Sequence, residues 1–354
     1  MRRYLVFAPA HFAANAKTAH GVIRYGTDHV VAVVDPTLAG KTVRELLPHL
    51  ASDAPIVATV RDGLHHSPSA LLIGTAPQGG QLPLDWRAEI LVAIDAGLEI
   101  VSGLHEMLGA DIEFSARAAK SGTRFWDVRS SPEVRLFSGE AYDVPAPVLL
   151  TVGSDCAVGK MTVSLELARA ATDRGKRSVF VPTGQTGMII AGWGTAVDRV
   201  ISDFASGAVE GLVLRAAASQ PDCIIVEGQG GINHPAYGAV TLALLHGAAP
   251  DALLLVAQPG RERIEGFGTP TLAYRKLIAI YKTLCAAVKP APVAGIALNT
   301  LGLSHAQAIA EIARARDETN LPVDDVVRFG PHVLYDAIAE KLTKRRPLAA
   351  EVLA

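Results

Sequence analysis

A short loop at residues 153–160 carries the residue types that bind phosphate groups. The preceding run Val-Leu-Leu-Thr-Val, at residues 148–152, predicts a buried strand, and a helix-like run begins at Met161. Glycines at a strand-to-helix turn let backbone N–H groups point toward an anion, and the lysine at the end of the turn adds a positive charge. We therefore predict a phosphate-binding loop. Its candidate cofactor-binding residues are Gly153, Ser154, Asp155, Cys156, Ala157, Val158, Gly159, Lys160, Met161 and Thr162.

The residue after the lysine limits the chemistry of this loop. In loops that hold Mg-ATP, that residue is a Ser or Thr whose hydroxyl binds Mg²⁺, whereas this chain has Met161. A thioether does not replace a hard oxygen ligand, so we expect no metal here. Coenzyme A suits such a loop, because its diphosphate needs an anchor and its acyl chemistry needs no metal. ATP with Mg²⁺ is the alternative.

Cys156 lies inside the loop and has two interpretations. Backbone N–H dipoles and the nearby Lys160 would favour a thiolate, which could form an acyl-cysteine intermediate. Alternatively, the cysteine is a small side chain that fits a tight loop. We favour the second interpretation because no histidine base lies nearby in the sequence.

A second loop, at residues 226–235, offers groups that exchange protons. Glu227 closes a strand-like run, and His234 follows a glycine-rich turn. Either side chain could accept a proton from an attacking amine, so both are candidate catalytic residues. Gln229 and Gly230 are candidate substrate-binding residues. Backbone N–H groups of residues 228–231 could stabilise a tetrahedral oxyanion.

Two further loops complete the expected ligand site. In open α/β sheets, ligands bind beyond the carboxyl ends of the strands, where neighbouring loops meet. The loop Pro-Thr-Gly-Gln-Thr-Gly, at residues 182–187, supplies Gln185 and Thr186 as candidate cofactor-binding residues. Arg261, in a Gln-Pro-Gly-Arg-Glu-Arg loop, could hold a substrate carboxylate in a bidentate fork, or it could belong to a solvated charged loop.

The elements that must position these loops alternate between strand and helix. In the first part, buried strand-like runs lie at residues 4–8, 30–35, 56–60, 71–74 and 99–101, with helix-like runs at residues 12–25 and 85–96. This alternation predicts parallel βαβ units. The turn after the first run is Ala-Pro-Ala-His, without the glycine fingerprint of dinucleotide sites. We therefore expect a Rossmann-like shape without an NAD site.

The second part of the chain repeats the alternation. Strand-like runs lie at residues 148–152, 178–181, 223–226, 252–256 and 293–298, with helix-like runs at residues 161–173, 272–288 and 332–344. A proline-rich segment without a sustained period, at residues 130–147, separates the two parts. We predict an α/β protein with mainly parallel sheets in two domains, a Rossmann-like domain at residues 1–140 and a P-loop domain at residues 141–354.

The composition excludes several classes of protein. The 354-residue chain is 49% hydrophobic and 19% charged, which is typical of globular proteins. Its net charge of −2 gives no basic field for nucleic acid, and it has no apolar run long enough for a membrane span. Its three widely spaced cysteines fit a reducing compartment, so we expect a cytoplasmic protein.

Several motifs together resemble a known family. They are Gly-Ser-Asp-Cys-Ala-Val-Gly-Lys-Met-Thr from residue 153, Pro-Thr-Gly-Gln-Thr-Gly, Val-Asp-Arg-Val-Ile-Ser-Asp-Phe at residues 197–204, Val-Glu-Gly-Gln-Gly and His-Pro-Ala-Tyr at residues 234–237. The loop alone is similar to that of dethiobiotin synthetase. The combination resembles a P-loop family with a Rossmann-like N-terminal domain, whose studied members look like D-glutamate N-acetyltransferases. The N-terminal motifs Trp-Arg at residue 86 and Ser-Gly-Leu-His at residue 102 extend the resemblance over nearly the whole chain.

This resemblance implies an enzyme that uses acetyl-coenzyme A to acetylate a D-amino acid, with D-glutamate as the expected acceptor. A homo-oligomer is expected for an α/β enzyme of this size. Two rival interpretations stay open. One is an ATP-dependent ligase or kinase related to dethiobiotin synthetase, and the other is a regulator that binds a nucleotide without catalysis.

Overall fold

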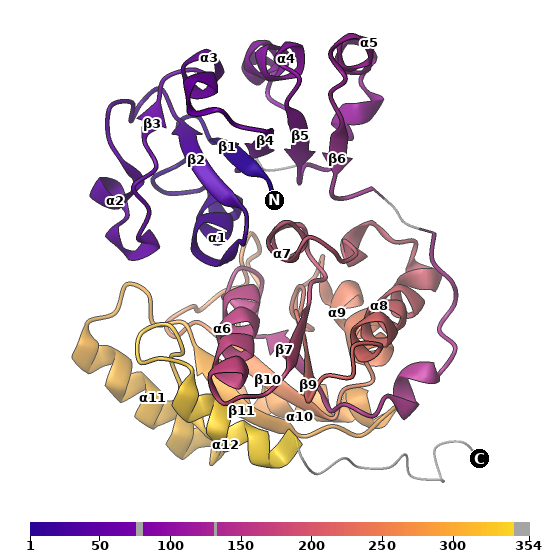
Figure 1. Cartoon of the computed structure of the whole chain (residues 1–354). Helices are drawn as coiled ribbons and strands as arrows, with labels where there is room; N and C mark the ends of the chain where they lie inside the picture. Colours follow the sequence, from indigo (N-terminus) through magenta and orange to yellow (C-terminus); the bar gives the residue numbers. More distant parts are fainter. Residues whose placement is uncertain (76–80, 131–132, 343–354) are drawn as a thin grey trace. The chain divides into compact units, whose positions relative to one another are not determined.

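A computed structural model describes residues 1–75, 81–130 and 133–342, and it divides the chain into two compact units (Figure 1). The first unit contains the described residues of 1–131 together with Gln185–Arg199. The second contains the described residues of 132–184 and of 200–354. The boundary that we placed at residue 140 stays a prediction. Each unit is built around its own sheet.

The first unit is built on a six-stranded sheet in the order β3-β2-β1-β4-β5-β6. Every pairing in it is parallel. The central strands are short apolar runs buried on both faces, as parallel sheets covered by helices require, whereas the edge strands β3 and β6 are only partly buried. They are β1 (Arg3–Phe7), β2 (His29–Val34), β3 (Ile56–Val57), β4 (Ala70–Ile73), β5 (Glu99–Ser102) and β6 (Phe125–Asp127).

Helices of the first unit connect these strands. One core cluster joins Leu5 and Leu71 of the sheet to Ile90 and Phe114 of two helices. Asp111 caps the last of these helices by accepting from the backbone N–H groups of Glu113 and Phe114. The helices are α1 (Lys17–Tyr25), α2 (Val43–Leu46), α3 (Val60–Gly63), α4 (Arg87–Asp95) and α5 (Ile112–Ser121), with 3₁₀ turns η1 (Pro48–Leu50), η2 (Leu64–His66), η3 (Leu84–Trp86) and η4 (Leu108–Ala110).

A segment from the second half of the sequence also belongs to the first unit. It contains α7 (Gln185–Ala191) and the 3₁₀ turn η6 (Val197–Arg199). The Thr186 and Thr18 hydroxyls are 2.9 Å apart, and the Asp198 carboxylate pairs with the Arg129 guanidinium. The chain therefore returns to the first unit after the second has begun.

The second unit is built on another six-stranded sheet, in the order β12-β11-β10-β7-β9-β8. Every pairing is again parallel. The two parallel sheets with interleaved helices confirm the predicted α/β class. The strands are β7 (Val148–Gly153), β8 (Ser178–Val181), β9 (Cys223–Val226), β10 (Ala252–Ala257), β11 (Val293–Leu298) and β12 (Val323–Asp324).

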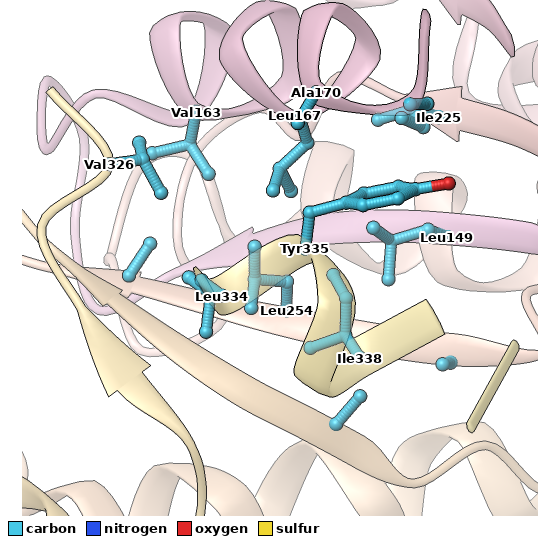
Figure 2. Packing of buried hydrophobic residues seen from close by; sticks show 14 of the residues in the cluster. Leu149, Val163, Leu167, Ala170, Ile225, Leu254, Val326, Leu334, Tyr335 and Ile338 are labelled. Carbon is cyan, nitrogen blue, oxygen red and sulfur yellow. The ribbon is translucent and has the colours of Figure 1, made fainter. Parts of the chain in front are cut away.

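Two helices of the second unit share one face of its sheet. The helix after the phosphate loop contributes Val163 and Leu167 to a core cluster, and the last helix contributes Leu334 and Ile338 (Figure 2). Right-handed crossovers place the other helices of the second unit, which join β8 through β12, on the opposite face. The elements are η5 (Glu140–Asp143), α6 (Lys160–Asp173), α8 (Ser202–Ala217), α9 (Gly238–Gly247), α10 (Tyr274–Ala286), α11 (His305–Thr319) and α12 (His332–Leu342).

The predicted helices differ from the observed ones mainly at their ends. The helix expected at residues 12–25 begins at Lys17, because the chain turns at residues 9–15. The helix expected at residues 272–288 spans Tyr274–Ala286. Residues 343 and 344 of the last predicted helix lie outside the described residues. None of the helices in the described part of the chain has the length and apolar character that a bilayer crossing requires.

Candidate functional site

The phosphate loop joins β7 to α6 in the second unit, as the sequence predicts. Two residues of the loop have left-handed backbone angles, with φ of 52° at Ala157 and 106° at Gly159. Alternation between right- and left-handed residues turns successive N–H groups toward one side and makes a concave anion site. The helix that begins at Lys160 directs further N–H groups to the same place. The observed backbone therefore fits a bound phosphate group.

Two glycines allow the loop and its neighbours to pack closely. A Cβ atom on Gly153 would lie 2.7 Å from the Lys160 Nζ atom and 2.7 Å from the Asp155 carbonyl oxygen. A Cβ atom on Gly228 would lie 1.8 Å from the Thr151 carbonyl oxygen. The Lys160 side chain is buried, and its ammonium donates to the Asp155 carbonyl 2.8 Å away. The Lys160 side chain therefore packs against the phosphate loop.

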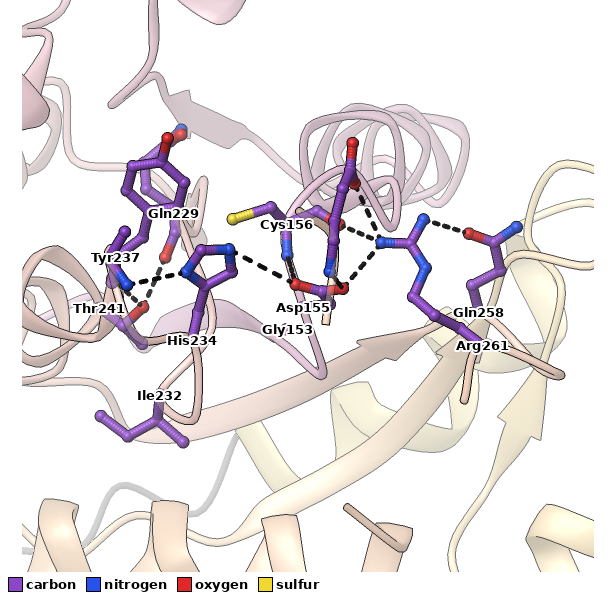
Figure 3. Close-up of polar contacts among 12 residues, drawn as sticks. Gly153, Asp155, Cys156, Gln229, Ile232, His234, Tyr237, Thr241, Gln258 and Arg261 are labelled. Carbon is purple, nitrogen blue, oxygen red and sulfur yellow. Dashed lines mark hydrogen bonds and ion pairs between the residues drawn. The ribbon is translucent and has the colours of Figure 1, made fainter. Parts of the chain in front are cut away.

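The Asp155 carboxylate is fully buried and holds the loop to the segment after β10 (Figure 3). It accepts from the Cys156 backbone N–H, the Arg261 guanidinium and the Glu265 backbone N–H, at 2.7, 2.9 and 2.8 Å. Arg261 also donates to the Cys156 carbonyl, the Glu265 carboxylate and Gln258. Burial alone would lower the pKa of Arg261, but its hydrogen bonds to Asp155 and Glu265 raise it. The guanidinium that we expected to receive a substrate carboxylate is therefore occupied by internal partners.

His234 is buried beside the loop, and its ring is held on several sides. The ring centroid lies 4.5 Å from that of Tyr237 and 5.1 Å from that of Phe267, two aromatic side chains that are partly exposed. The Nδ1 atom accepts from the Ala236 backbone N–H at 3.1 Å. The Nε2 atom points toward the loop and lies 4.0 Å from the Asp155 carboxylate (Figure 3).

The fold brings Cys156 close to a histidine that the sequence places far away. One ligand atom each of Cys156, His234 and Asp155 lie within 4.8 Å of one another. Cys156 is partly exposed, whereas burial raises the pKa of the Cys223 and Cys285 thiols to about 11 and about 12. The absence of a nearby histidine was our reason to interpret Cys156 as a filler, and in three dimensions that reason no longer holds.

Glu227 is buried directly after β9, the strand that pairs with β7. Its carboxylate accepts from the backbone N–H groups of Thr183 and Gly184 at 3.1 and 3.3 Å. Its carbonyl oxygen accepts from the Thr183 hydroxyl at 2.6 Å. The side chain therefore anchors the loop after β8, and its role as a base stays a prediction.

The two predicted substrate-binding residues of this loop, Gln229 and Gly230, have mainly structural contacts. The Gln229 side-chain amide donates to the Thr183 hydroxyl at 3.2 Å, and the Gln229 backbone carbonyl accepts from the Thr241 hydroxyl at 2.8 Å. Gly230 has a φ of 65°, and a Cβ atom there would lie 2.5 Å from the Tyr237 carbonyl oxygen. The structure thus explains the glycine by close backbone packing, and substrate binding here stays a prediction.

The predicted cofactor-binding residues are divided between the two units. The loop residues 153–162 lie in the second unit, whereas Gln185 and Thr186 lie in α7 of the first. The buried Thr186 hydroxyl is paired with Thr18. Sequence reasoning placed these two residues at the same sheet edge as the loop, because it treated the second half of the chain as a single domain.

One residue of the site was not identified from the sequence. The Tyr281 hydroxyl, on α10, donates to the Gly153 carbonyl at 2.6 Å and accepts from the Ile232 backbone N–H at 3.1 Å. The side chain is fully buried, and burial raises the pKa of its phenol. It joins the start of the phosphate loop to the loop that carries His234. In the sequence it is one of the apolar positions of an amphipathic helix, which gave no sign of this role.

Both parts of the chain match family models. Residues 135–335 match the model described as "Domain of unknown function (DUF1611_C) P-loop domain". Residues 36–131 match "Domain of unknown function (DUF1611_N) Rossmann-like domain". The chain belongs to the DUF1611 family. This confirms the family, with its Rossmann-like and P-loop domains, that the sequence motifs resemble.

Three similar proteins match most of this chain. A protein of Tritonibacter scottomollicae named D-glutamate N-acetyltransferase is 32% identical, over 95% of this chain and 98% of its own. A protein of Pseudoalteromonas sp. with the same name is 37% identical, over 73% of this chain and 78% of its own. A crystal structure of a DUF1611 family protein from Anabaena variabilis is 39% identical, with a TM-score of 0.92, and the match covers 96% of this chain and 100% of that one.

Proposed function

We propose that this chain is an N-acetyltransferase that transfers the acetyl group of acetyl-coenzyme A to the amino group of a D-amino acid, with D-glutamate as the acceptor. The names of two relatives that match most of this chain support the reaction class. The site supports the cofactor, because its loop has the backbone of an anion cradle. The loop residues 153–162 would hold the coenzyme phosphates.

The observation that carries the choice of cofactor is the lack of a hydroxyl after Lys160. Met161 is buried in the first turn of α6 and offers only a thioether. The Ser164 hydroxyl, one turn later, is paired with Thr151 and with the Lys160 carbonyl. A loop of this kind suits a diphosphate that is bound as an anchor, whereas phosphoryl transfer needs a hard ligand for Mg²⁺.

The acyl transfer requires a group that accepts a proton from the attacking amine. Glu227 is our candidate for this role because it directly follows β9, the strand that pairs with β7, and β7 leads into the phosphate loop. Backbone N–H groups of residues 229–231 would stabilise the oxyanion, whereas that of Gly228 already donates to the Thr151 hydroxyl. Acetyl-coenzyme A, when bound, supplies the activated thioester.

The test is a direct assay on the purified full-length chain. Acetyl-coenzyme A is incubated with D-glutamate, and N-acetylglutamate is quantified by chromatography, since Cys156 would interfere with a thiol-specific dye. L-glutamate, D-aspartate and D-glutamine serve as matched acceptors. We expect saturable product formation that is fastest with D-glutamate and is unchanged by a chelator. Absence of product with every D-amino acid would overturn the proposal.

A second assay tests the alternative that the chain is an ATP-dependent ligase or kinase. The chain is incubated with ATP and Mg²⁺, with and without each acceptor, and ADP is measured. We expect no release above the background of a Lys160→Ala variant. Mg²⁺-dependent ADP formation that requires Lys160 would instead support a ligase or kinase related to dethiobiotin synthetase.

A further inference from the structure

The hydrogen bond between Ala236 and His234 decides which nitrogen of the imidazole carries the proton. A backbone N–H donates to Nδ1 at 3.1 Å, so Nδ1 must present a lone pair. In a neutral imidazole the proton then lies on Nε2, because one ring nitrogen is a donor and the other an acceptor. The rings of Tyr237 and Phe267 hold the imidazole in this orientation.

This tautomer conflicts with three roles that a histidine in this place could have. A general base needs a lone pair facing the proton that it removes, whereas the nitrogen that faces the loop is already protonated. The same proton prevents Nε2 from activating the thiol of Cys156 as a base. It also blocks a metal ion from binding Nε2, since metal-bound histidines donate from their other nitrogen. The cluster of Asp155, Cys156 and His234 therefore does not have the hydrogen-bond pattern of a metal site.

What remains is a neutral N–H donor aimed at the phosphate loop. The Nε2 atom points toward the Asp155 carboxylate but lies 4.0 Å from it, beyond hydrogen-bonding distance. Both oxygens of that carboxylate already accept, one from the Cys156 N–H and the other from Arg261 and the Glu265 N–H. Arg261, which Asp155 shares with Glu265, offsets part of the negative charge, and the Lys160 ammonium within the loop adds a positive charge for an anion.

We infer that His234 is a hydrogen-bond donor, through Nε2, to a phosphate oxygen held in the loop. This inference rests on the proposed function, in which the loop binds the diphosphate of coenzyme A. It gives His234 a cofactor-binding role, whereas the sequence makes both His234 and Glu227 candidate bases. The proton of the attacking amine must then pass to another group, and Glu227 is the remaining candidate.

Two variants that replace His234 with an amide side chain distinguish a hydrogen-bond donor from a catalytic base at this position. In His234→Gln, the side-chain NH₂ reaches the place of Nε2 and can donate to a phosphate. In His234→Asn, the side-chain oxygen takes the place of Nδ1 and keeps the Ala236 bond, but no donor reaches the loop. Neither amide can act as a base at neutral pH or replace imidazole as a metal ligand.

Calorimetric titration with coenzyme A measures the effect on both variants and the wild type. Hydrogen bonds to charged groups are worth enough that we expect His234→Asn to raise Kd about 10- to 100-fold. His234→Gln should stay within about threefold of the wild type. Thermal unfolding of all three proteins checks that the fold is intact. Pantetheine, which has no diphosphate, should bind all three proteins equally.

Nitrogen-15 NMR of the histidine side chains reads the tautomer without any ligand. The chain has 11 histidines, and the His234 signal is assigned by its loss in the His234→Gln spectrum. We expect a neutral ring with its proton on Nε2. Addition of coenzyme A should shift the Nε2 resonance and leave the tautomer unchanged. A neutral ring protonated on Nδ1 would overturn the inference.

The outcomes distinguish this inference from the proposed function. If the wild type does not bind coenzyme A, the proposed function fails, and the NMR experiment still tests the tautomer. If the wild type binds and both variants lose affinity equally, the donor role is wrong. If His234→Asn lowers kcat while Kd for coenzyme A is unchanged, Nε2 of His234 donates to an oxygen of the reacting acyl group. The inference that it donates to a phosphate oxygen is then wrong.

Discussion

The Asp155 carboxylate has no exposed surface, and Arg261 is its charge partner. A buried charge without a partner is strongly destabilising. The arginine must therefore remain in place whenever the loop has its observed form. At the level of single residues, the phosphate loop depends on a side chain that comes more than a hundred positions later in the sequence. The sequence leaves open whether this arginine is a substrate fork or part of a solvated charged loop. Its internal partners favour a positioning role, and substrate binding by Arg261 stays a prediction.

Replacing Arg261 tests that assignment. Arg261→Met keeps the apolar stem and removes the charge, which leaves Asp155 buried and unpaired. We expect the free energy of unfolding to fall by about 3 kcal/mol, with weaker coenzyme A binding. Urea denaturation measures the first effect and calorimetry the second.

Arg263 provides the matched control for this variant. Its guanidinium donates to the Gly268 carbonyl in an exposed position, so Arg263→Met should be nearly neutral. The double variant Asp155→Asn, Arg261→Met should be more stable than Arg261→Met alone. A substrate fork predicts a different pattern, in which KM for D-glutamate rises while stability is unchanged. That pattern would rule out the positioning role.

At the scale of elements, the carboxyl ends of β7 and β9 are tied together by a side chain of α10. Tyr281 accepts from the Ile232 N–H and donates to the Gly153 carbonyl. Because its hydroxyl is fully buried, no solvent replaces these bonds if they are lost. The tyrosine thus fixes the distance between the phosphate loop and the loop that presents His234.

Removal of this hydroxyl should weaken both stability and binding. Tyr281→Phe leaves the partly buried Ile232 N–H and the buried Gly153 carbonyl without this partner, at a cost of about 1–3 kcal/mol. We expect a lower unfolding midpoint and a higher Kd for coenzyme A. Tyr274→Phe, on the same helix but beside Arg314, is the control and should leave Kd unchanged. Equal effects of the two variants on Kd would contradict the role of Tyr281.

The elements themselves could be predicted from the sequence, because buried parallel strands are continuous apolar runs. The run at residues 148–152 and the glycines after it were enough to place β7 and the phosphate loop. Contacts between distant residues were not predictable in the same way. Neither the approach of His234 to Cys156 nor the Tyr281 hydroxyl bonds has a local pattern, since each depends on how loops meet at the sheet edge. The ion pair between Arg261 and Asp155 could not be predicted from the sequence for the same reason.

At the scale of the whole molecule, the chain passes between its two units more than once. It leaves the first unit near residue 131, returns at Gln185 and leaves again after Arg199. Sequence reasoning predicted a single passage, because the βαβ alternation continues through residues 178–226 without a break. The α7 helix was therefore assigned to the second unit, whereas the structure groups it with the first. A ligand-binding role for Gln185 and Thr186 stays a prediction.

This path has a consequence for dissecting the protein. The Met188 and Ile189 side chains of α7 are buried in the complete chain, and α7 is grouped with the first unit. A fragment of residues 133–354 lacks that unit and would expose them. We expect the fragment to bind the dye ANS more strongly than the full chain and to aggregate.

A pair of substitutions in α7 should improve the solubility of the fragment but lower the stability of the full chain. Met188→Ser with Ile189→Ser removes the exposed apolar surface of the fragment, so its ANS fluorescence and aggregation should decrease. In the full chain the same change empties buried space, and large-to-small core substitutions cost about 2–5 kcal/mol each. Light scattering of the fragment and urea denaturation of the full chain measure the two effects. If the free energy of unfolding of the full chain rises or stays the same, the burial of α7 does not depend on the first unit. The fragment should then fold as an independent domain.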